Sequence, residues 1–192
     1  MDTCNFMKVN FLKWVVYALL LSLGSCKSCK KEVNPLSSLP AETQEGKNTF
    51  GCLIDGKPYT PDGSGGFGGA KPVTGGYYRG YQIWIRTYSK QGWDFSIFLE
   101  KGGKTGIYPL KFTTAGKPTE LNPPNHAIFY KYISFSETAI YATDSEYTGE
   151  VNITRADTIN QIISGTFFFK ARRLKTGEVI DITNGRFDVK NQ

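Results

Sequence analysis

The stretch WDFSIFLE, which runs from Trp93 to Glu100, alternates large apolar side chains with polar ones. Successive side chains of a β-strand point to opposite faces of the sheet, so a period of two indicates a strand that is buried on one side. One face of this strand carries Trp93, Phe95, Ile97 and Leu99, and the other carries Asp94, Ser96 and Glu100. The sequence therefore predicts that this segment is a strand of a half-buried sheet.

Similar segments recur between residues 48 and 192, and none of them has the 3.6-residue period of an amphipathic helix. Turn residues separate them, as at Asp55-Gly56-Lys57, which is a hairpin-turn signal. A glycine-rich loop is expected over Gly63–Gly76. The expected strands are Thr49–Ile54, Tyr78–Tyr88, Trp93–Glu100, Ile107–Phe112, Ala127–Phe135, Glu146–Thr154, Ile162–Ala171 and Glu178–Val189.

Short strands at near-regular spacing with turn residues between them favour an antiparallel architecture. The chain also has 13 Phe and 11 Tyr residues, which suit half-buried sheet faces better than helix interiors. We therefore predict an all-β domain over residues 48–192, built as an antiparallel β-sandwich or barrel-like sheet of about eight strands.

The N-terminal segment indicates export. An apolar run over residues 14–23 follows two lysines and is too short for a membrane-spanning helix. It ends in Leu23-Gly24-Ser25-Cys26, which resembles the lipobox of bacterial lipoproteins. We predict a lipoprotein signal peptide over residues 1–25 and lipidation of Cys26, with several acyl chains that hold the protein to a membrane. Two alternatives are a plain secretory signal and a buried core helix. Met7 is an alternative initiator.

Residues 26–47 contain few large apolar side chains and two prolines, so we expect a disordered tether. Removal of residues 1–25 takes two Lys and one Asp from the 23 basic and 17 acidic residues, which leaves a net charge of +5. The basic residues are scattered, and we expect solubility and mild attraction to anionic envelope polymers, but no nucleic-acid partner. Cys29 and Cys52 either form a disulfide or leave Cys52 buried and free.

Two motifs resemble a family of uncharacterised Bacteroidetes lipoproteins. They are GKNTFGCLIDGKPYTP at residues 46–61 and IISGTFFFKARRLKTGEVIDITNGRFDV at residues 162–189. The resemblance implies an all-β fold and brings no activity. From the motif residues themselves, we interpret Gly51 and Gly165 as sites of bulges or close strand approach, and Asn184-Gly185 as a turn.

The sequence contains partial matches to catalytic and cofactor-binding motifs, but each lacks the structural context that its chemistry requires. Gly63–Gly68 matches G-x-G-x-x-G, but a dinucleotide site needs that loop between a strand and a helix. His126 is the single histidine, which excludes a histidine-rich zinc site, and no G-x-S-x-G elbow accompanies it. We interpret His126 as a surface or strand-start residue. We therefore predict no enzyme, no cofactor and no metal.

The aromatic residues beside the glycine-rich loop suggest a binding surface. Exposed rings with nearby arginines would form a stacking and hydrogen-bonding platform for sugars, although Trp84 and Trp93 also suit core packing. The candidate platform is Tyr77, Tyr78, Arg79, Tyr81, Trp84, Tyr88 and Trp93. Asp157-Thr158-Ile159 matches an O-glycosylation pattern of Bacteroidetes, with Thr158 as the acceptor; the alternative is a turn cap by Asp157.

Together these observations predict a lipid-anchored protein of the bacterial cell envelope, facing either the periplasm or the cell surface from the outer membrane. The expected function is non-catalytic ligand binding, with a glycan as the leading candidate. A structural or assembly component of an outer-membrane complex is the alternative, with an envelope protein as its partner. A glycan-active hydrolase is a second alternative, because the acid pairs of glycosidases are arranged only in three dimensions.

Overall fold

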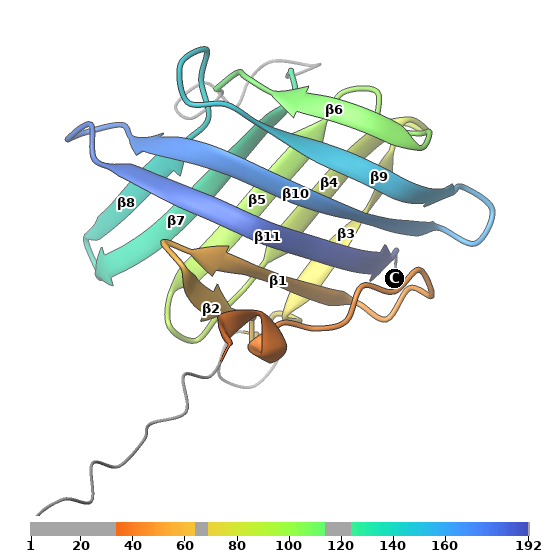
Figure 1. Ribbon diagram of the computed structural model, residues 1–192, viewed down its shortest axis with the longest axis horizontal. Coiled ribbons are helices and arrows are strands. Elements are labelled where there is room, and N and C mark those ends of the chain that lie inside the picture. Colours follow the sequence, from red (N-terminus) through yellow and green to blue (C-terminus); the bar gives the residue numbers. More distant parts are fainter. Residues whose placement is uncertain (1–33, 64–68, 114–123, 192) are drawn as a thin grey trace, which may run out of the picture. The chain divides into compact units, whose positions relative to one another are not determined.

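The computed structural model describes residues 34–63, 69–113 and 124–191. These residues form one short 3-10 helix and eleven strands (Figure 1). The elements are η1 Pro35–Ser38, β1 Thr49–Ile54, β2 Lys57–Tyr59, β3 Val73–Tyr78, β4 Gln82–Thr87, β5 Trp93–Leu99, β6 Gly106–Leu110, β7 His126–Ser134, β8 Glu137–Ala142, β9 Gly149–Asp157, β10 Ile162–Arg173 and β11 Val179–Lys190.

All strand pairs within the sheet are antiparallel, and the main order is β2-β1-β11-β10-β8-β7-β5-β4-β3. β9 pairs with β10, and β6 pairs with β9. The long strand β10 pairs with β9 and β11 over most of its length and with β8 only at Arg172 and Arg173. The sheet bends sharply where β10 passes from β9 to β8, at Arg172 and Arg173.

The curled sheet has two layers that cross each other in Figure 1. We call β6, β9, β10, β11, β1 and β2 the front layer, and β8, β7, β5, β4 and β3 the back layer. This half-barrel confirms the predicted all-β, antiparallel, barrel-like class.

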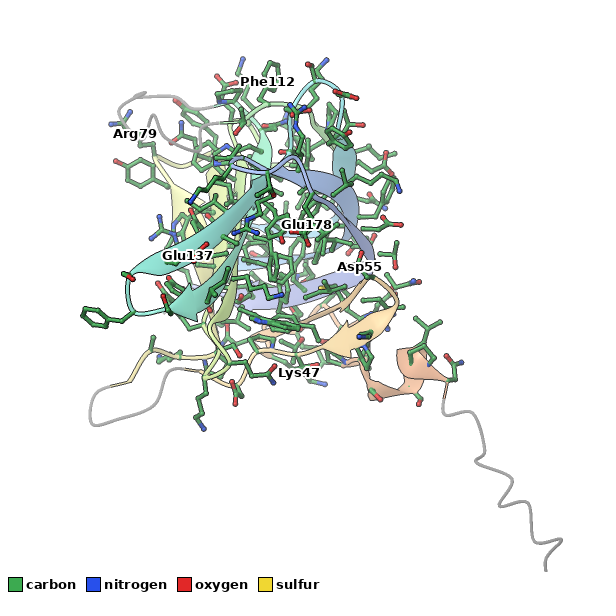
Figure 2. All side chains as sticks on the ribbon, turned by 90° about the vertical axis from the view of Figure 1, so that its left-hand side faces the viewer. Lys47, Asp55, Arg79, Phe112, Glu137 and Glu178 are labelled. Atoms are coloured by element: carbon green, nitrogen blue, oxygen red, sulfur yellow. The ribbon has the colours of Figure 1, made fainter. Side chains whose placement is uncertain are left out.

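The core lies between the two layers, and Figure 2 shows the space between them filled with side chains. In the opening segment, Phe95, Ile97 and Leu99 are buried in this core, as the alternation predicts. Phe95 lies at the centre of a ring cluster, with ring centroids 5.3 Å from Phe50 and 4.9 Å from Phe129. Burial of such a side chain contributes about 1.5–3 kcal/mol, so this aromatic cluster contributes to the cohesion between the layers together with the buried aliphatic residues.

Several predicted boundaries are wrong, and backbone geometry explains why. The segment Tyr78–Tyr88 is not one strand, because Arg79 and Gly80 have φ values of 51° and 79° and turn the chain between β3 and β4. The predicted loop Gly63–Gly76 ends earlier than expected, since β3 begins at Val73. β2, β3 and β8 were not among the expected strands, and they raise the number of strands from about eight to eleven.

The glycine predictions had mixed outcomes. The Asp55-Gly56 turn between β1 and β2 is confirmed, with φ values of 48° and 77°. Gly51 and Gly165 lie at register shifts, as predicted. Asn184-Gly185 is not a turn, because it lies inside β11 at an irregularity opposite β10. A Cβ on Gly185 would lie 2.5 Å from the ring of Phe167, so glycine is required there for close packing.

The ordered part begins upstream of the predicted boundary at Asn48. Residues 34–47, which were assigned to a tether, include η1 and a segment that we call the strap, Pro40–Lys47. Asp188 of β11 accepts hydrogen bonds from the Thr43 hydroxyl at 2.6 Å and from three strap amides. A buried carboxylate with several donors is a strong local anchor, so a polar segment becomes ordered without a hydrophobic face.

Residues 1–33 lie outside the part that the structure describes, and the predicted signal peptide, Cys26 and Cys29 are among them. No helix among the described residues is long and apolar enough to cross a membrane.

Candidate functional site

The seven residues of the predicted aromatic platform lie in three different places. Tyr77 and Trp93 point inward and pack against the core. The Tyr77 hydroxyl donates to the carbonyl of Ile162 at 3.4 Å, and burial raises the pKa of Tyr77 to about 12. Trp93 stacks on Tyr59 with ring centroids 6.4 Å apart. These two residues belong to the interior and are not free for a ligand.

A second group lies at the tip of the β3–β4 hairpin. Tyr78 and Tyr81 are about half exposed, and the Arg79 guanidinium lies 5.1 Å from the centre of the Tyr78 ring. Figure 2 shows Arg79 at the periphery of the molecule. Tyr81 and Lys104 line a shallow surface hollow there. This tip has stacking surfaces, but it does not converge with the other aromatic residues.

Of the remaining two residues, Trp84 lies with Arg86 on the outer face of β4, because alternate residues of a strand share a face, and Tyr88 follows directly after the strand. They line a pocket of about 360 Å³ at the edge of the back layer. Its lining is Lys71, Val73, Thr74, Gly75, Trp84, Arg86, Tyr88, Lys190 and Asn191. We call this the cationic pocket. Its volume is in the range of small-molecule sites.

Two glycines of β3 shape the cationic pocket by letting the end of β11 approach. A Cβ on Gly75 would lie 2.8 Å from the carbonyl oxygen of Trp84 and 3.2 Å from Val189. A Cβ on Gly76 would lie 2.7 Å from the Asn191 side chain. Any larger residue would push the two layers apart here, so the glycines bring Lys190 and Asn191 beside β4.

Backbone hydrogen bonds fix the pocket walls. The Lys190 amide donates to Oδ1 of Asn48 at 2.9 Å, and the Asn191 amide donates to the carbonyl of Gln161 at 3.0 Å. On the opposite wall, the Tyr88 amide donates to the carbonyl of Pro72 at 2.9 Å, which places Lys71 next to Tyr88. The walls are therefore formed before any ligand arrives.

All charged side chains that line the cationic pocket are positive. Lys71, Arg86 and Lys190 line it, and no carboxylate does. Among the described residues, no carboxylate forms an ion pair with Arg86 or Lys190. Positive groups that converge on a concave surface focus the field and attract anions. An arginine also offers a planar fork of donors to a carboxylate or sulfate.

The cationic pocket presents groups of the kind that ligands bind. Trp84 and Tyr88 provide rings against which a sugar can stack, and the cations provide donors for an acidic group. Nucleophilic catalysis needs a base beside a hydroxyl or thiol. Thr74 carries the one aliphatic hydroxyl in the lining of the cationic pocket, and no histidine or carboxylate lines the pocket beside it.

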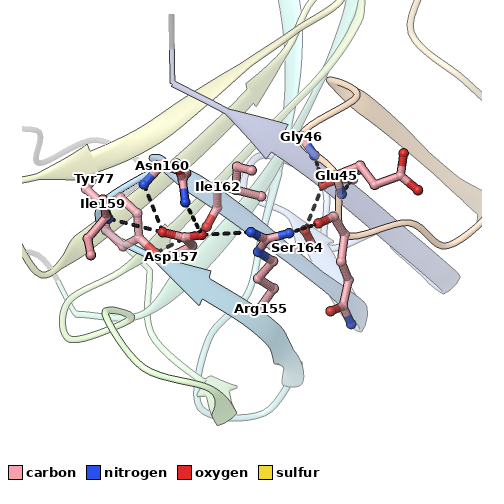
Figure 3. Close-up of polar contacts among 11 residues, drawn as sticks. Glu45, Gly46, Tyr77, Arg155, Asp157, Ile159, Asn160, Ile162 and Ser164 are labelled. Atoms are coloured by element: carbon pink, nitrogen blue, oxygen red, sulfur yellow. Dashed lines mark hydrogen bonds and ion pairs between the residues drawn. The ribbon is translucent and has the colours of Figure 1, made fainter.

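Two other predicted site residues, Thr158 and Cys52, lie in a turn and in the core. Thr158 is exposed in the turn between β9 and β10, where Asp157 Oδ1 accepts the amide of Asn160 at 2.8 Å (Figure 3). The cap by Asp157 is thus present, and glycosylation of Thr158 stays a prediction. Cys52 is free and fully buried, and burial raises the pKa of its thiol far above the usual range.

His126 begins β7, as predicted, but it is not a surface residue. It is 6% exposed and stacks on Phe98 with ring centroids 5.6 Å apart. Its Nδ1 lies 2.7 Å from the carbonyl oxygen of Pro124, and burial lowers its pKa. The described residues contain no group of three or more His, Cys, Asp or Glu that could hold a metal ion.

Comparison with known protein families matches residues 84–189 to a domain of unknown function, DUF6252. The chain belongs to this family. The DUF6252 match runs from Trp84 in β4 to Val189 in β11, so it includes the aromatic wall of the cationic pocket and ends just before Lys190. It confirms the resemblance as far as an uncharacterised domain family, and the lipoprotein character stays a prediction. No curated protein and no solved structure matches the chain.

Sequence reasoning found the aromatic wall of the cationic pocket and the neighbouring arginines, and it missed Lys71 and Lys190. Lys71 and Lys190 are far apart in the sequence, and no local pattern connects either of them with Arg86. The one useful signal was Gly75-Gly76 next to Tyr77, which we interpreted as part of a loop. A glycine pair inside a strand indicates close approach of another segment, which here is the end of β11.

Proposed function

We propose that the domain is a non-catalytic binding module for an acidic carbohydrate, and that the cationic pocket holds the acidic sugar. One observation carries the proposal: Lys71, Arg86 and Lys190 surround two aromatic rings with no carboxylate in the lining. A ring supports the apolar face of a pyranose, and the cations select a uronate or a sulfate over a neutral sugar.

The predicted envelope location fits such a ligand, since acidic polysaccharides are extracytoplasmic. We propose that an acyl anchor on Cys26 keeps the pocket at the membrane. Fractionation of cells that express the wild type and Cys26→Ala tests this point separately. Wild-type protein in the membrane fraction and variant protein in the soluble fraction would support the anchor, and equal distribution would contradict it.

Calorimetric titration of the purified protein with trigalacturonate tests the pocket. Arg86→Gln and Lys190→Gln should each weaken trigalacturonate binding by about tenfold, because each removes a charge-assisted contact. Lys175→Gln is the matched control, since it removes the same charge from an exposed turn outside the cationic pocket. Equal losses in all three variants would mean that net charge alone attracts the ligand, and the proposal would be wrong.

Salt gives an independent check on the same complex. Exposed charge pairs are screened at physiological ionic strength, so trigalacturonate affinity should fall as salt rises, while a contribution from stacking on Trp84 remains. Trp84→Ala should weaken binding at both low and high salt. An unchanged affinity in Trp84→Ala would place the ligand outside the cationic pocket.

A further inference from the structure

A second groove lies on the outer face of the front layer, beside the strap. It has a volume of about 270 Å³, and residues of the strap, β9, β10 and β11 line it. Asn152, Thr166 and Arg186 are paired neighbours across β9, β10 and β11, so their side chains share one face. We call this hollow the strap groove.

The strap holds the guanidinium of Arg186 at one wall of the groove. Nη1 of Arg186 donates to the carbonyl of Pro40 at 3.3 Å and lies 4.0 Å from a carboxylate oxygen of Glu42. Its Nε is buried and has no hydrogen-bond partner. That buried donor is out of a ligand's reach, but Nη2 of Arg186 bonds no described residue, so the guanidinium retains a donor at the groove wall.

Other polar groups of the strap groove are also unused. Among the residues that the structure describes, no hydrogen bond joins the side chain of Asn152, Thr166 or Glu150 to another group. An amide, a hydroxyl and a carboxylate together offer both donors and acceptors, which is the combination that a sugar hydroxyl requires. Phe168, which pairs with Glu150 across β9 and β10, is 50% exposed beside them.

We propose that the strap groove binds a neutral pyranose. The ring of Phe168 stacks on the apolar face of the sugar, and Asn152, Thr166 and Arg186 bond its hydroxyls. Glu42 and Glu150 line the same groove with a single arginine, so an acidic sugar meets net repulsion there. The strap groove therefore differs from the cationic pocket in charge, in position and in ligand.

This inference does not rest on the function proposed for the cationic pocket, because the two sites share no lining residue. Either can fail while the other stands. A domain with both sites would bind a polysaccharide of mixed composition at two points.

The test is titration of the isotope-labelled, purified protein with maltotriose, cellotriose, laminaritriose and mannotriose at millimolar concentration, followed by amide NMR. At least one of these neutral sugars should shift the side-chain amide of Asn152 and the backbone amides of Thr166 and Phe168. Trigalacturonate should leave these signals in place. No shift at the strap groove with any of the four sugars would overturn the proposal.

Two variants identify the groups that bind. Phe168→Ala should weaken the neutral sugar by about tenfold through loss of the stacking surface. Thr166→Val replaces the hydroxyl with a methyl group of similar size and should weaken the neutral sugar several-fold. Ile159→Ala is the control, because Ile159 is 91% exposed in the β9–β10 turn outside the strap groove.

The folded state of each variant is checked on the same NMR spectra. Arg86→Gln in the cationic pocket should leave the neutral-sugar affinity unchanged. If Phe168→Ala binds as tightly as the wild type while its spectrum stays native, the sugar lies elsewhere and the proposal is wrong.

Discussion

Two neighbouring positions on the outer face of β11 show how differently one strand can use its polar residues. Asp188 is 1% exposed and accepts five hydrogen bonds, from Thr43, Glu45, Gly46, Lys47 and Ser164. Arg186, two residues away, has a buried Nε without a partner and faces an open groove. The first position is saturated by the protein itself, and the second is not.

The difference separates structural polar groups from candidate binding groups. A saturated carboxylate has no capacity left for a ligand, and its removal orphans the donors around it. An accessible polar group without a protein partner contributes little to folding and is available for recognition. Stability measurements should therefore divide the polar residues into two classes, and each prediction below tests that division.

The largest effect is expected at Asp188. Asp188→Asn would turn an amide donor toward five donors, so we expect the free energy of unfolding to fall by about 3 kcal/mol or more. Urea unfolding of wild type and variant measures it. The control is Asp181→Asn, whose exposed ion pair with Lys170 should be worth less than about 1 kcal/mol. Equal losses in both variants would contradict the distinction.

Low pH should remove the stability that the Asp188 carboxylate provides. Burial by itself raises the pKa of the Asp188 carboxyl, but the hydrogen-bond donors around it together lower that pKa to about 2 from the ordinary 3.8. A group whose pKa is lower in the folded state stabilises the fold above its unfolded pKa, and that stability is lost as the pH falls through the folded pKa. The stability difference between wild type and Asp188→Asn should therefore shrink from about pH 4 to about pH 2. A difference that stays constant over this window would contradict the assignment.

A matched pair on β10 gives a smaller contrast. The Ser164 hydroxyl is buried and donates to Asp188 at 2.7 Å, so Ser164→Ala should lower the free energy of unfolding by about 1–2 kcal/mol. Thr166 lies two residues along on the same face, and its hydroxyl bonds no described residue. Thr166→Val should change stability by less than about 0.5 kcal/mol. Thermal and urea unfolding compare the two, and a reversed order would refute the division.

The smallest effects are expected in the cationic pocket. Arg86→Gln and Lys190→Gln remove exposed charges that pair with no described carboxylate, so each should change the free energy of unfolding by less than about 0.5 kcal/mol. A loss above about 1 kcal/mol in either would show that these cations hold the fold together. They would then be unsuited to a purely ligand-binding role.

The sequence predicted the sheet where alternation is strong and failed where glycine or short strands weaken it. Phe95, Ile97 and Leu99 form an unmistakable buried face, and the structure confirms it. β8 was missed because its two core-facing residues, Ala139 and Tyr141, give too short a pattern. Asn184-Gly185 has the composition of a turn, yet packing against Phe167 keeps it inside β11.

The sites were less predictable than the sheet, because contacts across the sequence build them. Trp84 and Tyr88 were found as aromatic residues, but their cationic partners Lys71 and Lys190 come from distant segments. The strap could not be predicted from its composition, which is that of a polar linker. Its order depends on Asp188, more than 140 residues downstream, and no local pattern in the strap indicates that partner.

The strap also limits how far the domain can lie from Cys26. A fully extended chain spans at most about 3.5 Å per residue, so the 22 residues from Cys26 to Lys47 could extend roughly 75 Å if all of them were a spacer. Because residues 34–47 are bound to the domain, only the eight residues from Cys26 to Val33 remain, and they span at most about 28 Å. An acyl group on Cys26 would thus keep Asn34, where the described part of the chain begins, within about one bilayer thickness of the lipid surface.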